Sequence, residues 1–198
     1  MIHSWSVRLA GFLAMELNLG ERRQAVVAYG LEVLIGALIK VIIFIAVPCV
    51  LGVFNLFMAT LLSAGILRLP SGGVHCSAYY RCLVSALTIH IVIAFAAQHL
   101  ATFSLPALGI LYVVLSITFI TFLKLAPVDV KEKPILSTVR RKNLKIVSCS
   151  MVIVYFIFFS VWQPAQDILL ACSMGIMFQT FNLTRAGHKF FNWIDAHI

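Results

Sequence analysis

The sequence predicts an all-α membrane protein with six transmembrane helices, an N-terminal interfacial amphipathic helix, and a broken or re-entrant segment between the second and third spans. The 198 residues are 62% hydrophobic and 11% charged, with a mean hydropathy of +1.02, whereas ordinary soluble domains are about 25% charged. Long apolar runs recur along the chain, and basic residues fall in alternate connections between them. One core of this size could not bury so much apolar surface in water. We therefore expect a single integral-membrane domain over residues 1–198.

Residues 1–20 are expected to form a helix that lies along the membrane interface. Their apolar residues recur at helical spacing, while Ser4, Arg8 and Glu16 occupy other positions, which is typical of an amphipathic interfacial helix. Arg8 and Glu16 also interrupt the apolar core that a signal peptide requires, so we expect no cleaved signal in this segment. The apolar residues at this spacing are Ile2, Trp5, Leu9, Phe12 and Leu13.

Six apolar runs follow, each close to the roughly 17–25 residues that cross a bilayer as a helix. The first run is expected to stop at Pro48, because proline lacks the N–H that continues a helical hydrogen-bond pattern. The expected spans are about 25–47, 50–67, 83–100, 103–123, 146–162 and 165–183.

The distribution of positive charge predicts the orientation of these spans. Of the fifteen Lys and Arg residues, fourteen lie before the first span, between the second and third, between the fourth and fifth, or after the sixth. Under the positive-inside rule, this alternation places both termini and residues 68–82 on the cytoplasmic side. We assign the net charge of +8 to topology and to contact with anionic lipid or substrate. No nucleic-acid-binding module is visible, so no nucleic-acid partner is expected.

The connection between the second and third spans carries the candidate chemistry. It contains His75 and Cys82, the residue types of a thiol nucleophile and its base. On one unbroken helix their seven-residue spacing would separate them by about 10.5 Å along the axis, too far for proton transfer over roughly 3 Å. A break is therefore required, and Gly72-Gly73, preceded by Pro70, supplies it. Such non-helical backbone is tolerated at membrane depth where it lines a cavity or is buried in protein.

Electrostatics and redox compartment favour a reactive thiolate at Cys82. Neighbouring Arg81, nearby Arg68 and a helix dipole would each stabilise the charged form, and the cytoplasm keeps thiols reduced. Other readings of this segment stay open. The cysteine and histidine could serve packing alone, and Cys76 is a rival nucleophile.

A metal site is a further alternative for the same segment. His75, Cys76 and Cys82, with His90, could offer four ligands, but their spacing matches no usual zinc pattern. We therefore expect neither a metal nor a cofactor.

The motif in this segment resembles that of the accessory gene regulator protein B (AgrB) family, membrane cysteine endopeptidases that process quorum-sensing propeptides in bacteria. The shared pattern is an arginine seven residues before the histidine, a glycine two before it and a cysteine seven after it, here Arg68, Gly73, His75 and Cys82. Glu132 departs from the family, in which many members have asparagine. The likeness extends to Ala126-Pro127-Val128-Asp129, Lys133-Pro134 and the basic run Arg140-Arg141-Lys142.

The resemblance implies a concrete activity. Cys82 would attack a peptide bond of a small AgrD-like precursor with an amphipathic leader and a charged tail, with His75 as the base. The tail would leave, and the resulting thioester would promote cyclisation. Arg68, Gly72, Gly73, Arg140, Arg141 and Lys142 would bind substrate or position the loop.

The same resemblance implies a bacterial cell membrane, and it leaves a homodimer open. The alternative function is a small multi-pass transporter or scaffold without covalent chemistry. Against a transporter, the sequence shows neither internal symmetry nor paired intramembrane charges.

Overall fold

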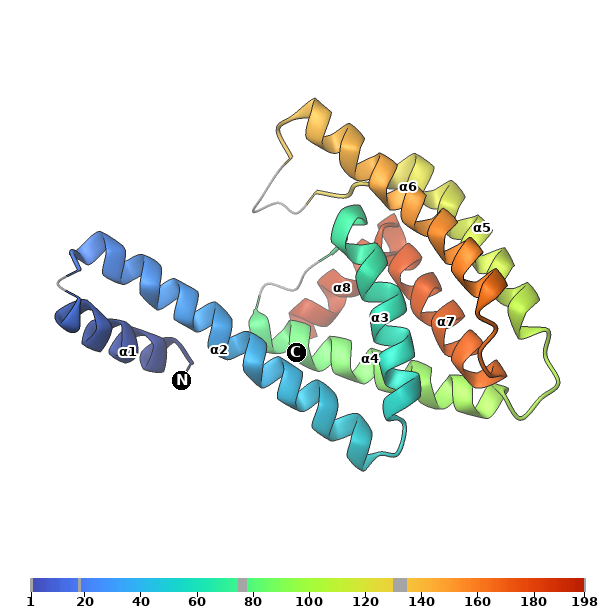
Figure 1. Ribbon diagram of the computed structural model, residues 1–198, viewed down its shortest axis with the longest axis horizontal. Helices are drawn as coiled ribbons and strands as arrows, with labels where there is room; N and C mark the ends of the chain where they lie inside the picture. Colours follow the sequence, from blue (N-terminus) through green and yellow to red (C-terminus); the bar gives the residue numbers. More distant parts are fainter. Residues whose placement is uncertain (1, 18, 75–77, 130–134, 198) are drawn as a thin grey trace. The chain divides into compact units, whose positions relative to one another are not determined.

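The computed structural model describes residues 2–17, 19–74, 78–129 and 135–197 (Figure 1). Within these ranges the chain forms eight α-helices, and its one β-like feature is an isolated bridge between Gly72 and Val128. The predicted all-α class is therefore confirmed. The helices are α1 (Ile2–Glu16), α2 (Glu21–Val50), α3 (Phe54–Ser71), α4 (Tyr79–Leu100), α5 (Ala107–Leu125), α6 (Thr138–Val161), α7 (Gln166–Asn182) and α8 (Arg185–His197).

The chain divides into two compact units, residues 1–51 and residues 52–198. The first unit is a hairpin of α1 and α2 (Figure 1). Within it, His3 Nδ1 lies 2.9 Å from Glu32 Oε2. The expected N-terminal helix is thus present as α1. The single-domain organisation expected for residues 1–198 stays a prediction.

The expectation that Pro48 stops the first span is wrong. Helix α2 includes Pro48 and continues to Val50, and the backbone N–H of Leu51 still donates to Val47 O at 3.1 Å. Membrane helices tolerate proline because neighbouring groups satisfy the freed carbonyl. The helix instead ends just before Gly52, which has a positive φ of 71°.

Helix α7 is the central element of the second unit, where it packs against α3, α4, α5 and α8. Ten of its seventeen residues are buried. Its contact with α3 is close, because a Cβ placed on Gly175 would lie 2.5 Å from the carbonyl oxygen of Thr60. Helices α5 and α6 lie side by side at the edge of this bundle (Figure 1).

Among the residues that the structure describes, five helices, α2 to α6, are long and apolar enough to cross a membrane. The sixth expected span, residues 165–183, coincides with α7, which has 17 residues. The expected count of six spans is therefore not confirmed, although a helix occupies each expected range.

Helices α2, α4 and α6 begin at least four residues earlier than the hydropathy predicts, and α4 and α6 carry candidate site residues. Helix α4 begins at Tyr79 rather than Leu83, and α6 begins at Thr138 rather than Ile146. Hydropathy misses these turns because their residues are polar or charged, although they continue the same helices. Cys82 and the basic run 140–142 consequently lie in helical first turns.

Candidate functional site at the ends of helices α3 and α4

A sharp bend ends α3. Gly72 has φ 73° and ψ −149°, and Gly73 has φ 134°, conformations that only glycine adopts without strain. A Cβ on Gly72 would also lie 2.3 Å from Val128 O. The predicted break is therefore present at the glycine pair. Pro70 does not cause it, since it lies buried within the last turn of α3.

The bend is held against the segment that follows α5. The backbone N–H of Val128 donates to Ser71 O at 2.9 Å, and Gly72 and Val128 form a parallel bridge. The next residue, Asp129, forms an ion pair with Arg141 in the first turn of α6. This segment therefore connects the glycine pair to the basic run. Arg141 lies 68 positions after Gly73 in the sequence.

Arg68 lies in the last turn of α3 and points its guanidinium at the bend. Its Nη2 donates to the carbonyl of Val74, and its Nη1 donates to Gln179 Oε1 at 3.3 Å. A planar guanidinium can hold two acceptors in this way, whereas an ammonium lacks the fork geometry. These contacts favour loop positioning over direct substrate binding as the role of Arg68.

Cys82 is half-buried in the first turn of α4. Its backbone N–H donates to Ala78 O at 3.2 Å, which places the residue near the positive end of the helix dipole. A thiolate is stabilised at such a position. His75 and the rival nucleophile Cys76 lie outside the described residues, so the pairing of His75 with Cys82 stays a prediction.

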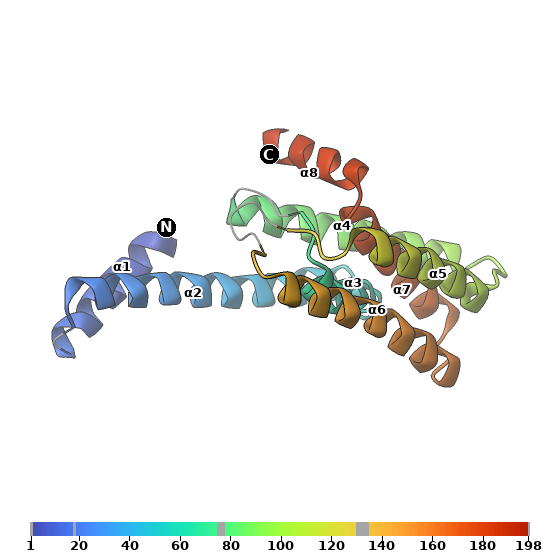
Figure 2. The same ribbon diagram turned by 90° about the horizontal axis from the view of Figure 1, so that it is seen from above.

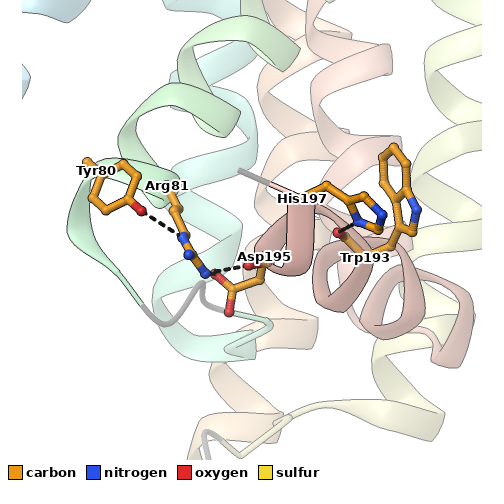
Figure 3. A network of polar contacts seen from close by, with 5 residues as sticks. All are labelled: Tyr80, Arg81, Trp193, Asp195 and His197. Carbon is orange, nitrogen blue, oxygen red and sulfur yellow. Dashed lines mark hydrogen bonds and ion pairs between the residues drawn. The ribbon is translucent and has the colours of Figure 1, made fainter.

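Arg81, next to Cys82, connects α4 to the C-terminal helix (Figure 3). Its Nη1 donates to the Asp195 backbone carbonyl and lies 3.4 Å from Asp195 Oδ1, and its Nε donates to Tyr80 Oη at 3.1 Å. Figures 1 and 2 both show α8 beside the start of α4. The expected support of a Cys82 thiolate by Arg81 is weakened, because Asp195 partly balances the Arg81 charge.

The Arg81–Asp195 ion pair is expected to contribute modestly to the docking of α8. Its side chains are 27% and 24% exposed, so solvent screens the pair, and Asp195→Asn should weaken the docking of α8 only slightly. We expect chymotrypsin to cut after Trp193 up to about 3-fold faster in this variant. Raising the salt concentration should reduce the difference, since salt screens partly exposed charges. Equal cutting rates at low salt would show that the charge contributes nothing.

The basic run lies on the exposed start of α6. Ser137 caps this helix by accepting from the backbone N–H of Arg140 at 3.3 Å, and all three basic side chains are exposed. The helix dipole makes cations unfavourable at a helix N-terminus, and the ion pair with Asp129 offsets this cost for Arg141. The run comprises Arg140, Arg141 and Lys142.

His90, considered as a metal ligand, is part of the helix packing. It is buried between the rings of Phe57 and Phe178, and its Nδ1 lies 3.0 Å from Thr60 Oγ1. Over residues 2–17, 19–74, 78–129 and 135–197, no three His, Cys, Asp or Glu side chains gather in a metal-binding group.

Sequence reasoning missed two buried residues of α7 that contact this site. Gln179 binds the bend directly, and Asn182 binds Gln179. A signal was present, because a carboxamide pair three residues apart is unusual in an otherwise apolar span. The sequence alone could not show which neighbouring helix the pair faces.

Fold and composition together define the class of the protein: an all-helical, multi-pass membrane protein with a polar bend between two of its helices. Residues 6–183 match the family model described as Accessory gene regulator B. The chain therefore belongs to the AgrB family, which places it in quorum-sensing gene regulation at the membrane, in association with a propeptide. The match ends before α8 begins.

Two relatives from Clostridium perfringens align over almost their whole length. AgrB-like protein 2 of strain 13 is 28% identical over 209 residues, and the AgrB-like protein of strain SM101 is 27% identical over 211 residues. Each alignment covers 99% of this chain and 97% of the relative. Both names state a likeness to AgrB rather than a measured activity. No solved structure matches the chain.

Proposed function

We propose that this protein is a membrane-embedded cysteine endopeptidase that removes the C-terminal tail of an AgrD-like propeptide and promotes cyclisation of the remainder. The observation that carries this proposal is the placement of Cys82 in the first turn of α4, directly after the break that begins at Gly72. Family membership and the His75 spacing support the same chemistry. The charge distribution supports a cytoplasmic location for this site and for both termini.

The proposed reaction has two acyl transfers. His75 takes the proton of the Cys82 thiol, and the thiolate attacks the scissile carbonyl. The C–N bond breaks, the imidazolium gives its proton to the leaving amine, and the tail departs from a thioester on Cys82. A cysteine or serine side chain within the bound peptide then attacks the thioester, loses its proton, and releases the Cys82 thiol as the ring closes. A site that excludes water favours this ring closure over hydrolysis.

The basic turn of α6 would serve an acidic precursor tail. Arg140, Arg141 and Lys142 are exposed at the start of α6, and Asp129 connects this turn to the glycine bend. A positive surface next to the site would raise the local concentration of an acidic peptide. The other proposed partner is the bilayer itself, which would hold an amphipathic leader.

Capture of the acyl-enzyme tests the proposal directly. The full-length protein in lipid nanodiscs would be mixed with a synthetic precursor whose internal cysteine is replaced by alanine, so that the ring cannot close. We expect a mass increase equal to the precursor without its tail, reversed by hydroxylamine and mapped to Cys82. Tail release with an adduct on Cys76, or with no adduct on any cysteine, would overturn the assignment of Cys82.

Arg68 is expected to matter more than an ordinary exposed basic residue. Arg68→Ala removes the hydrogen bonds to Val74 and Gln179, and loss of two such contacts should slow cleavage about 10- to 100-fold. Arg68→Lys should recover little of this activity, because lysine lacks the fork. Arg185→Ala, at the exposed start of α8, is the matched control and should cleave normally. Equal rates for both alanine variants would reduce Arg68 to a topology signal.

A further inference from the structure

Gln179 uses its whole hydrogen-bonding capacity in the structure. Its Nε2 donates to Ser71 Oγ at 3.0 Å and to Gly72 O at 2.9 Å. Its Oε1 accepts from Arg68 Nη1 at 3.3 Å and from Asn182 Nδ2 at 3.5 Å. A carboxamide offers two N–H donors and two acceptor lone pairs, so nothing is left over for other partners. Such complete satisfaction fixes the orientation of the side chain.

These contacts concentrate on the bend rather than on the shared length of α3 and α7. Three of the four partners of Gln179 lie within residues 68–72. Further along the two helices, Ser63 Oγ donates to Cys172 O at 3.4 Å, Cys172 Sγ lies 3.8 Å from Ala59 O, and the backbones pack closely at Gly175. A buried carboxamide is costly in an apolar interior unless it is fully paired. Its placement at the bend therefore indicates a role in setting the conformation there.

Asn182 lies beside the same bend, on the same helix. It is 2% exposed, and a Cβ on Gly73 would lie 3.7 Å from its own Cβ. Its Nδ2 is held by Gln179, whereas its Oδ1 is buried with no hydrogen-bond partner in the part of the chain that the structure describes. An unpaired buried acceptor is unfavourable, and such groups in native proteins call for a functional explanation. The missing partner must be a hydrogen-bond donor.

We propose that Gln179 and Asn182 are positioning residues of the thiol-protease site: Gln179 fixes the bend that leads to His75, and Asn182 Oδ1 accepts a hydrogen bond from an N–H group during the reaction. The donor is either the His75 imidazole or a backbone amide of the bound precursor. This inference rests on the proposed function. It assigns to α7 a part in holding the bend, beside the contacts that Arg68 and Val128 already make there.

Paired substitutions test the Gln179 assignment. Gln179→Met keeps the volume and removes every hydrogen bond, whereas Gln179→Glu keeps the acceptor for Arg68 and loses both N–H donors. We expect the methionine variant to lower kcat at least about 10-fold, with KM changed less than about 3-fold. The glutamate variant should recover little, because its carboxylate faces the Gly72 carbonyl.

The control lies one residue away on α7. Thr180 Oγ1 bonds Thr118 Oγ1 on α5 at 2.7 Å and not the bend, so Thr180→Val removes a buried hydrogen bond of similar structural importance. We expect it to lower the melting temperature but keep kcat within about 2-fold. Equal kcat losses in Thr180→Val and Gln179→Met would reduce Gln179 to an ordinary stabilising residue and overturn its assignment.

Kinetics as a function of pH test the acceptor role of Asn182. Asn182→Leu removes Oδ1, and Asn182→Asp keeps an oxygen at that place. We expect the rate of precursor cleavage to fall at least about 10-fold in the leucine variant and to recover substantially in the aspartate variant. A lower kcat with a shifted pH profile would identify the imidazole as the donor. A higher KM with an unchanged pH profile would identify the peptide.

The outcomes separate this inference from the proposed function. Wild-type kinetics in Asn182→Leu, or equal losses of activity in the leucine and aspartate variants, would overturn the acceptor role of Asn182. If Asn182→Leu does not fold, Asn182→Ala takes its place in this test. If Cys82→Ser cleaves the precursor normally, the proposed function itself fails. If Cys82→Ser is inactive while Gln179→Met and Asn182→Leu are normal, only the positioning inference fails.

Discussion

Cleavage of the precursor is expected to fall at least about 1,000-fold when Cys82 is replaced by serine. The serine hydroxyl is far less acidic than a thiol, and the same imidazole and helix terminus cannot activate it to a comparable extent. His75→Ala should produce a loss of similar order, because the two groups act as one unit. Release of the tail from a synthetic precursor, followed by mass spectrometry, measures both effects.

Two other cysteine substitutions complete this test. Cys49→Ser, at an exposed position of α2, should leave cleavage unchanged and so controls for the loss of a thiol in general. Cys76→Ser tests the rival nucleophile and should also retain activity. Normal processing by Cys82→Ser would rule out the proposed mechanism, and loss of processing in Cys76→Ser alone would move the nucleophile to that residue.

The second large effect is expected at the bend itself. Gly72→Ala requires an L side chain at φ 73°, with a Cβ 2.3 Å from the Val128 carbonyl oxygen. The backbone conformation costs about 1–3 kcal/mol, and the clash must displace either Gly72 or the segment around Val128. We expect a total destabilisation of about 3 kcal/mol and near-complete loss of cleavage. Thermal unfolding of the detergent-solubilised protein measures the destabilisation.

A glycine on the same helix provides the matched control. Gly65 lies within α3 with helical geometry, and a Cβ placed there meets no atom within 4 Å. Gly65→Ala should therefore be neutral or slightly stabilising, because alanine is the better helix former. If Gly72→Ala is as stable and as active as Gly65→Ala, the bend does not need the conformation seen here.

The sequence predicted the helices well where apolar character alone defines them, and less well at their charged ends. The expected run 165–183 and α7 at Gln166–Asn182 nearly coincide, because both ends of this run are marked by a change in polarity. The starts of α4 and α6 were misplaced by four and eight residues, from 83 to 79 and from 146 to 138. Hydropathy reports burial in lipid, whereas a helix continues for as long as its backbone hydrogen bonds can.

Some residues of the candidate site could be predicted from the sequence, and others could not. Cys82, Arg68 and the glycine pair could be predicted, because chemistry and backbone freedom require those residue types. Gln179 could not, since its role depends on contacts more than one hundred positions away in the sequence, such as Gln179 Nε2 to Ser71 Oγ. The bridge between Gly72 and Val128 is also a tertiary contact, although it spans only 56 positions of the sequence.

The sequence by itself determined a multi-pass helical protein in lipid, because more than half of its residues are apolar and a bilayer accepts apolar chain as hydrogen-bonded helices. It also determined where the chain must bend, because consecutive glycines remove the Cβ constraint. Only the tertiary structure decided what holds that bend in place. A buried carboxamide needs partners on every donor and acceptor, and packing of α7 against α3 is what brings Arg68, Ser71 and Gly72 within its reach.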